Sequence, residues 1–215
     1  MKKAIIGGVV AAGLGSAAIV TAQDAPPPQM PGQMDVSRVE AGSYVTDPAH
    51  TLVQWEVSHF GFNPYYGLFG DVEGTLQLDP DDLSATRLAV TIPITSLAVV
   101  SEGLREHMLR GGKDGEGPDF FGPTPADARF VATRVERTGD TSATIRGDLT
   151  MLGVTQPIVI EAEFTGAGAN PMSDAQTIGF TGTTTITRSD FGMDYAVPMI
   201  SDEVDLTISA AFEKQ

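Results

Sequence analysis

Three side chains of this chain have the types and spacing to take part in ligand chemistry. His59 and Arg188 each fall in register with apolar residues at every second position, and Asp190 follows Arg188 by two residues. Because a strand places alternate side chains on one face, both polar groups are predicted to lie among apolar side chains. An inward guanidinium needs a partner, which would be Asp190 or an anionic or carbonyl group of a ligand. The alternative is that each residue ends its strand and reaches solvent.

Metal binding and covalent catalysis have little support in the sequence. The three histidines, His50, His59 and His107, fall on a predicted turn, strand and helix, without the close spacing of metal-binding pairs. The chain has no cysteine, no G-x-S-x-G elbow and no glycine-rich nucleotide loop. We therefore expect no metal, no cofactor and no catalytic residue. An enzyme that uses His59 or His107 as acid or base is the alternative.

The elements that would position these side chains are predominantly strands. In Thr51–Phe60 (TLVQWEVSHF), the residues Val53, Trp55 and Val57 share a face with His59. The same period of two recurs over residues 71–79, 87–94, 129–136, 143–151, 158–164, 178–188 and 204–212. Ser101 and the glycines after Arg110 delimit one short helix, and residues 63–70 are predicted to form a turn or rim loop. We predict an all-β fold, an antiparallel up-and-down barrel of about eight strands with one short helix, with a two-sheet sandwich as the alternative.

The charge balance narrows the class of partner. The chain has 28 acidic and 13 basic residues and a formal net charge of -15. Nucleic acids and anionic lipid surfaces are bound by clusters of lysine and arginine, so neither is expected to bind here. We predict no nucleic acid partner.

The N-terminal residues are predicted to lie outside the folded domain. Residues 1–22 combine a basic start, an apolar run and small residues before Gln23, which is typical of a secretory signal peptide cleaved after Ala22. A retained membrane anchor is the alternative. Residues 23–42 are rich in proline and are predicted to form a flexible or extended leader. The barrel domain is then expected to span residues 43–215.

Short motifs along the chain resemble those of the YceI-like family. They occur in the family's order and span residues 44–212: Tyr44-x-x-Asp47-Pro48-Ala49-His50-Thr51, Val57-Ser58-His59-Phe60-Gly61, Gly67-x-Phe69, Gly74-Thr75-Leu76, Ser96-Leu97, His107-x-Leu109, Phe120-Phe121, Phe130, Gly147-x-Leu149-Thr150, Gly153-Val154-Thr155-x-Pro157 and Arg188-Ser189-Asp190-Phe191-Gly192-Met193. The chain departs from the pattern at Thr51, where serine is usual, and in an insertion over residues 111–118.

This resemblance implies a lipocalin-like barrel in the periplasm that holds a long isoprenoid lipid, such as a polyprenol, a polyprenyl phosphate or a quinone. We expect no further cofactor, and we leave open a transient membrane contact and a homodimer. The predicted ligand-binding residues are Val53, Trp55, Val57, His59, Leu76, Val90, Ile92, Phe180, Ile186, Arg188, Asp190, Leu206 and Ile208. Small barrels are usually filled by their own side chains, so a solid core, and a stress-protective barrel without a specific ligand, are the alternatives.

Overall fold

The computed structural model describes residues 29–113 and 116–215, which form ten strand segments, one α-helix and four short 3-10 helices. The predicted signal peptide lies outside the described residues. The strands are β1 (Gly42–Thr46), β2 (Leu52–His59), β3 (Asn63–Phe69), β4 (Glu73–Leu78), β5 (Arg87–Ile92), β6 (Ala128–Arg137), β7 (Ser142–Met151), β8 (Val154–Ala169), β9 (Gln176–Thr187) and β10 (Glu203–Lys214). The helices are α1 (Glu102–Met108), η1 (Val36–Arg38), η2 (Leu83–Ala85), η3 (Ile94–Ser96) and η4 (Arg188–Phe191).

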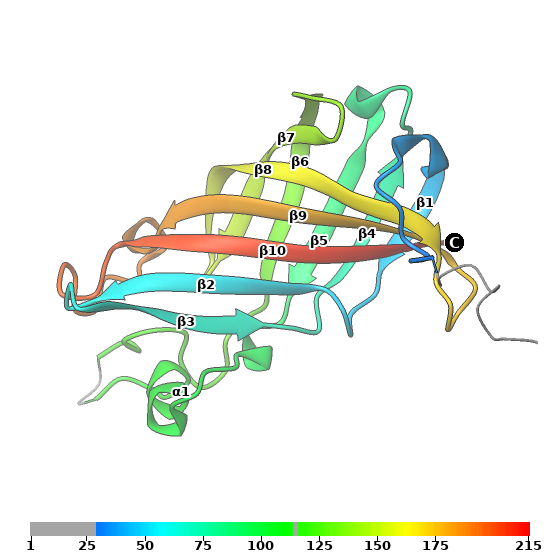
Figure 1. The fold of residues 1–215 in the computed structure, drawn as a ribbon. Helices are drawn as coiled ribbons and strands as arrows, with labels where there is room; N and C mark the ends of the chain where they lie inside the picture. The colour runs from blue at the N-terminus through cyan, green and yellow to red at the C-terminus, as the bar shows by residue number, and fades with distance from the viewer. Residues whose placement is uncertain (1–28, 114–115) are drawn as a thin grey trace, which may run out of the picture.

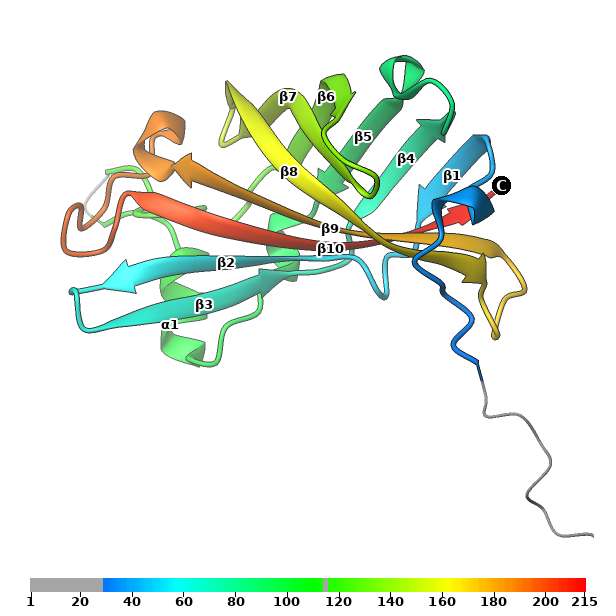
Figure 2. The same cartoon turned by 45° about the horizontal axis from the view of Figure 1, so that its top comes forward.

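The strands close into an antiparallel barrel, as predicted (Figure 1). The order is β1-β4-β5-β6-β7-β8-β9-β10, and pairing of β1 with β10 completes the circle. β2 continues β1 along the edge of β10, and β3 pairs with β2 just as β4 pairs with β1. β1 and β2 therefore form one long strand with an interruption, and β3 and β4 form another. The ten segments thus make an eight-stranded barrel. The β2–β3 ribbon and the loop between β9 and β10 reach the same end of the molecule (Figure 2).

Thr51 maintains the hydrogen bonding where β1 gives way to β2. Its buried hydroxyl lies 3.2 Å from both the amide nitrogen and the carbonyl oxygen of Ala211 on β10. Thr51 thus satisfies the Ala211 amide, and the Ala211 carbonyl also accepts a hydrogen bond from the Asp47 amide at 2.8 Å. Asp47 accepts hydrogen bonds from the Ala49 amide and the exposed His50 ring within the same turn. The motif that opens the family resemblance therefore has a structural role at this interruption.

One expectation about local structure needs correction, and two further features were not anticipated from the sequence. Residues 63–70 were predicted to form a turn or rim loop, but β3 occupies most of them because every residue from Asn63 to Phe69 pairs with β2. β1 was not predicted. Within the leader, Gln33 exchanges two backbone hydrogen bonds with Ala167, and Gln176 donates to the carbonyl of Arg38. Residues 31–41 are thus docked on the β8–β9 end of the barrel (Figure 2).

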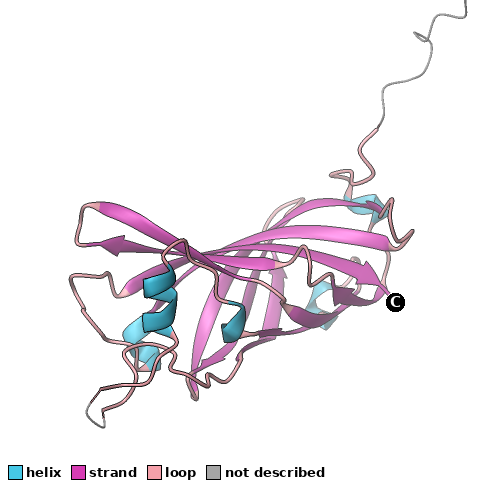
Figure 3. Cartoon of the chain, turned by 90° about the horizontal axis from the view of Figure 1, so that it is seen from below, coloured by secondary structure: helices cyan, strands magenta, loops and turns pink. Residues whose placement is uncertain are grey.

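The helix α1 and a cluster of buried side chains lie in different parts of the barrel. α1 lies outside the sheet beside β2 and β3 (Figures 1 and 3), and Ser101 caps it by accepting a hydrogen bond from the Leu104 amide. The other end holds a compact cluster of buried side chains: Tyr44, Leu76, Leu78, Phe164, Ala167, Ile178 and Phe212. Within the described residues, no helix has the length and apolar character needed to cross a membrane.

Candidate ligand-binding site

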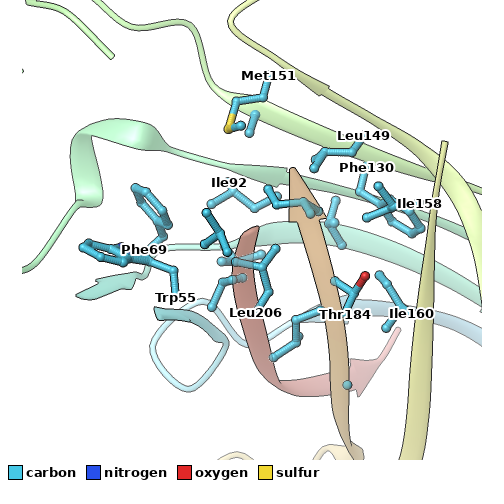
Figure 4. Close-up of a pocket in the computed structure, with 18 of the residues that line it drawn as sticks. Trp55, Phe69, Ile92, Phe130, Leu149, Met151, Ile158, Ile160, Thr184 and Leu206 are labelled. Atoms are coloured by element: carbon cyan, nitrogen blue, oxygen red, sulfur yellow. The ribbon is translucent and has the colours of Figure 1, made fainter. Parts of the chain in front are cut away.

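The barrel encloses a cavity of about 650 Å³, within the usual range of small-molecule sites. Side chains from β2, β3 and β5 to β10 point toward this common space (Figure 4). The predicted binding residues that line it are Val53, Trp55, Val57, His59, Leu76, Val90, Ile92, Phe180, Ile186, Arg188, Leu206 and Ile208. The solid-core alternative is therefore wrong for this part of the barrel.

Several lining residues were missed from the sequence. Phe130, Leu149, Ile158 and Ile160 come from the strands opposite β2, and Leu104 and Met108 come from α1. The strand residues followed the same period-two pattern as the chosen ones, so that signal was available. The helical residues were not identifiable in this way, because α1 reaches the cavity only through tertiary packing.

Gly67 makes room for the Trp55 ring. The two residues face each other across β2 and β3, and a Cβ on Gly67 would lie only 2.2 Å from the Trp55 ring. Only glycine leaves space for the ring to lie against the neighbouring strand at this position. Trp55 therefore lines the cavity in a fixed position and is 7% exposed.

Arg188 lines the cavity but binds backbone carbonyls with most of its donors. Its Nε donates to Ser201 O at 2.9 Å, and Nη1 donates to Met193 O at 2.9 Å. Nη2 donates to Tyr195 O at 2.9 Å and to Ile200 O at 3.1 Å. A guanidinium has five N–H groups, so one is left over. Arg188 thus holds together the loop between β9 and β10.

Asp190 lies outside the cavity, so the expectation that it would partner Arg188 or a ligand is wrong. Its side chain is exposed, and its backbone carbonyl accepts a hydrogen bond from Gln156. The nearby carboxylate is Asp202, which accepts hydrogen bonds from the Ser189 amide and hydroxyl. The Ser189 hydroxyl, together with the charge of Arg188, lowers the pKa of Asp202 below 3.8. Burial lowers the pKa of Arg188, and Asp202 opposes that shift.

The cavity opens beside the tip of the β2–β3 ribbon. Phe60, Tyr195 and Met199 line the cavity and are also exposed, at 49%, 43% and 57%. The Phe60 amide donates to Met199 O at 2.8 Å, which joins the ribbon to the β9–β10 loop. Phe62, at the ribbon tip, is 88% exposed. The mouth is therefore surrounded by apolar side chains.

His59 and His107 lie on different sides of this opening. The His59 ring packs edge-on against Phe60, with centroids 4.5 Å apart. His107 Nε2 lies 2.6 Å from Asp119 Oδ2, and its ring packs edge-on against Phe120 and Tyr195. This hydrogen bond lowers the pKa of Asp119. His107 therefore ties α1 to the two loops beside the mouth.

The cavity offers little charge to a ligand. Its lining residues include no aspartate, glutamate or lysine within the part of the chain that the structure describes. The described residues also contain no group of three or more histidine, cysteine or acidic residues placed to hold a metal ion. Trp55 Nε1 and Tyr65 Oη are buried polar atoms of this lining with no hydrogen-bond partner among the described residues.

A closed antiparallel barrel around an apolar cavity defines a lipocalin-like barrel. This chain belongs to the YceI-like family, because the YceI-like domain profile matches residues 44–212. A UPF0312 protein of Pseudomonas fluorescens (strain SBW25) is 33% identical over 185 residues, which cover 85% of this chain and 92% of the relative. A UPF0312 protein of Pseudomonas putida (strain F1) is 34% identical over 77% of this chain and 82% of the relative.

Solved structures share the fold. The Campylobacter jejuni YceI protein has a TM-score of 0.58 at 27% identity, covering 69% of this chain and 84% of that protein. BcnA of Burkholderia cenocepacia has a TM-score of 0.65 at 20% identity, covering 77% and 98%. A polyisoprenoid binding domain from Saccharophagus degradans has a TM-score of 0.56 at 11% identity, covering 82% and 100%. At such low identities the last two show the fold alone.

Proposed function

We propose that this protein binds a long-chain isoprenoid lipid in the barrel cavity and carries it without chemical change. The apolar cavity of about 650 Å³ is the observation that carries the proposal. Burial of apolar surface stabilises a complex by about 25 cal/mol per Å², so transfer of an isoprenoid tail from water into the cavity is favourable. Support also comes from the fold shared with the polyisoprenoid binding domain of Saccharophagus degradans.

An isoprenoid carrier must receive its ligand from a membrane, and the mouth of this barrel suits that contact. Phe60, Phe62 and Met199 are exposed there, and residues 59–69 contain no acidic or basic residue other than His59. Aromatic side chains are favoured at the membrane interface. Since the chain has a net charge of -15, we propose a transient contact with zwitterionic lipid. The periplasm is the proposed location, supported by the signal-peptide pattern of residues 1–22.

The proposal is tested by native mass spectrometry and solvent extraction of the purified protein. We expect a bound isoprenoid. Thr184 lines the cavity and Thr183 faces outward on the same strand, so Thr184→Phe should reduce the bound lipid and Thr183→Phe should not. Equal occupancy in both variants, or a protein that is free of lipid, would refute binding in the cavity. Conversion of an added isoprenoid would support the enzyme alternative with His59 or His107.

A further inference from the structure

Three phenylalanine rings form the floor of the cavity at the end away from the mouth. Phe164 on β8, Phe180 on β9 and Phe212 on β10 are the last residues of their strands toward this end that line the cavity. The Phe180 ring packs edge-on against the other two, with centroids 5.9 Å from Phe164 and 6.3 Å from Phe212. Beyond the rings, Ile178 and Ala167 pair with each other and are both 0% exposed.

Phe180 is the floor ring that a ligand can reach. Phe164 and Phe212 are each 5% exposed, whereas Phe180 is only half-buried. Phe180 shares its face of β9 with the buried Ile178 and with Gly182, which lines the cavity. Gly182 is the next inward position toward the mouth and adds no side chain above the ring. The accessible part of the Phe180 ring is therefore directed into the cavity.

The floor limits the length of tail that the cavity can hold. Phe180 and Arg188, beside the mouth, are eight residues apart along β9, which corresponds to about 26 Å at about 3.3 Å per residue. Four carbon–carbon bonds of about 1.5 Å make an extended isoprene unit about 5 Å long, so this path holds about five units. At the packing density of a protein interior a unit takes up about 110 Å³, so the cavity of about 650 Å³ holds at most about six.

We infer that the floor selects isoprenoids by tail length, and that Phe180 sets the limit at about five to six isoprene units. This inference rests on the proposed function and deepens it, because it specifies the size of the lipid. A longer tail leaves apolar units outside the mouth in water, whereas a membrane keeps every unit in an apolar medium. A lipid that exceeds the limit is therefore bound less well than one that fits.

The test lets prenols of different length compete for the delipidated protein. An equimolar mixture of all-trans prenols of every length from farnesol through geranylgeraniol and hexaprenol to octaprenol is supplied in phosphatidylcholine vesicles. The protein is then separated from the vesicles, and native mass spectrometry measures the share of each bound prenol. Wild type should bind prenols up to hexaprenol and should bind octaprenol at least about tenfold less. An octaprenol share equal to that of hexaprenol would overturn the inference.

Two variants change the floor in opposite directions. A phenyl ring has about the volume of one isoprene unit, so Phe180→Ala should raise the longest prenol that binds well by about one unit. Ala210 pairs with Phe180 and lines the cavity, so Ala210→Phe should lower this limit by about one unit. Ser209→Phe is the matched control, because it adds the same ring at an exposed position of β10 and should leave the distribution unchanged.

The outcomes separate the length limit from isoprenoid binding itself. Ala210→Phe retains the Phe180 ring, so it tests the floor even where Phe180→Ala does not fold. An unchanged limit in a folded floor variant, or the same shift in Ser209→Phe, would overturn the inference while leaving isoprenoid binding intact. If wild type binds none of the prenols, the proposed function fails and the inference with it.

Discussion

At the residue scale, the polar side chains that line the cavity differ in whether they have hydrogen-bond partners. Arg188 is 3% exposed and satisfies four backbone carbonyls of the β9–β10 loop. His107 is engaged with Asp119 at 2.6 Å. Trp55 and Tyr65 have no such partners. Sequence register placed Arg188 among apolar side chains, but only its hydrogen bonds show that its role is structural.

Replacing Arg188 by lysine is therefore expected to reduce stability. Lysine has one nitrogen and cannot reach four carbonyls in a plane, so the free energy of unfolding should fall by about 2–4 kcal/mol. Urea denaturation followed by Trp55 fluorescence measures this. Arg146→Lys, at an exposed position on β7, should change stability by less than about 0.5 kcal/mol. A stable Arg188→Lys protein that selectively loses phosphate-headed ligands would instead assign Arg188 to ligand binding.

The Asp119 carboxylate should make stability depend on pH. The hydrogen bond from His107 lowers its pKa in the folded protein below 3.8, so its contribution is present above pH 3.8 and is lost as the pH falls through the lowered value. The difference in urea midpoint between wild type and Asp119→Asn should therefore shrink below pH 3.8. Asp127→Asn, at an exposed position in the same loop, should match wild type. A difference that grows on acidification would contradict this assignment.

At the element scale, the β2–β3 ribbon combines three properties. It extends the barrel wall, it presents Trp55 and Tyr65 inward, and it carries Phe60 and Phe62 outward at its tip. Its inner face depends on Gly67, which leaves space for the indole. Of the two strands of the ribbon only β2 was predicted from the sequence, because residues 63–70 contain proline and glycine, which usually indicate a turn. The pairing with β2 outweighs that local preference.

Substitution of Gly67 by alanine should disturb this inner face. The added Cβ would lie 2.2 Å from the Trp55 ring, and such overpacking costs about 1–3 kcal/mol of stability. The emission of Trp55, the only tryptophan, should shift as its ring moves. Gly103→Ala, on α1 with no atom within 4 Å of the new Cβ, should instead stabilise the protein by up to about 1 kcal/mol. Unchanged emission and stability in Gly67→Ala would show that the ring does not rest on this strand.

The ribbon tip should also govern membrane contact. Phe62→Ser removes the most exposed aromatic ring there and should lower binding to phosphatidylcholine vesicles by about fivefold to tenfold, measured by flotation. Met172 is 94% exposed in the loop between β8 and β9, at the other end of the barrel, so Met172→Ser is the control. An equal loss in both variants would argue against docking through the mouth. Loss of dimers in Phe62→Ser would assign this surface to a second copy.

At the scale of the whole molecule, closure of the barrel combines stability with an internal space. Pairing of β1 with β10 closes the circle, and among the described strands β3 pairs only with β2. A cluster of buried side chains lies at one end, and the cavity extends from this cluster to the other end. Since the cavity exists only in the folded protein, any ligand that occupies it must stabilise the fold.

Ligand binding should therefore raise the urea midpoint. At a free ligand concentration one hundred times the Kd, the added stability is about 2.7 kcal/mol. The delipidated protein is unfolded with and without geranylgeraniol, and the midpoint should increase only with the ligand. Thr184→Phe, which fills the cavity, should lose this response, whereas Thr183→Phe keeps it. The absence of any shift at a ligand concentration that saturates binding would place the ligand outside the barrel.

The sequence by itself determined the strand pattern, the resemblance to the YceI-like family and the inward face of most strands. The strand pattern and the inward faces follow from a period of two, which depends only on neighbouring residues, whereas the resemblance follows from short motifs in their order along the chain. The lining positions of β2, β5, β9 and β10 were therefore predictable, and Asp190 was misplaced because η4 ends the alternation directly after β9.

Tertiary structure alone decided the partners of Arg188, the interruption between β1 and β2, the docking of residues 31–41 and the existence of an open cavity. Each depends on groups far apart in the chain: Thr51 bonds to Ala211, and Gln33 pairs with Ala167. Whether a barrel is filled depends on the summed volumes of side chains from every strand. Only the closed barrel brings these side chains together.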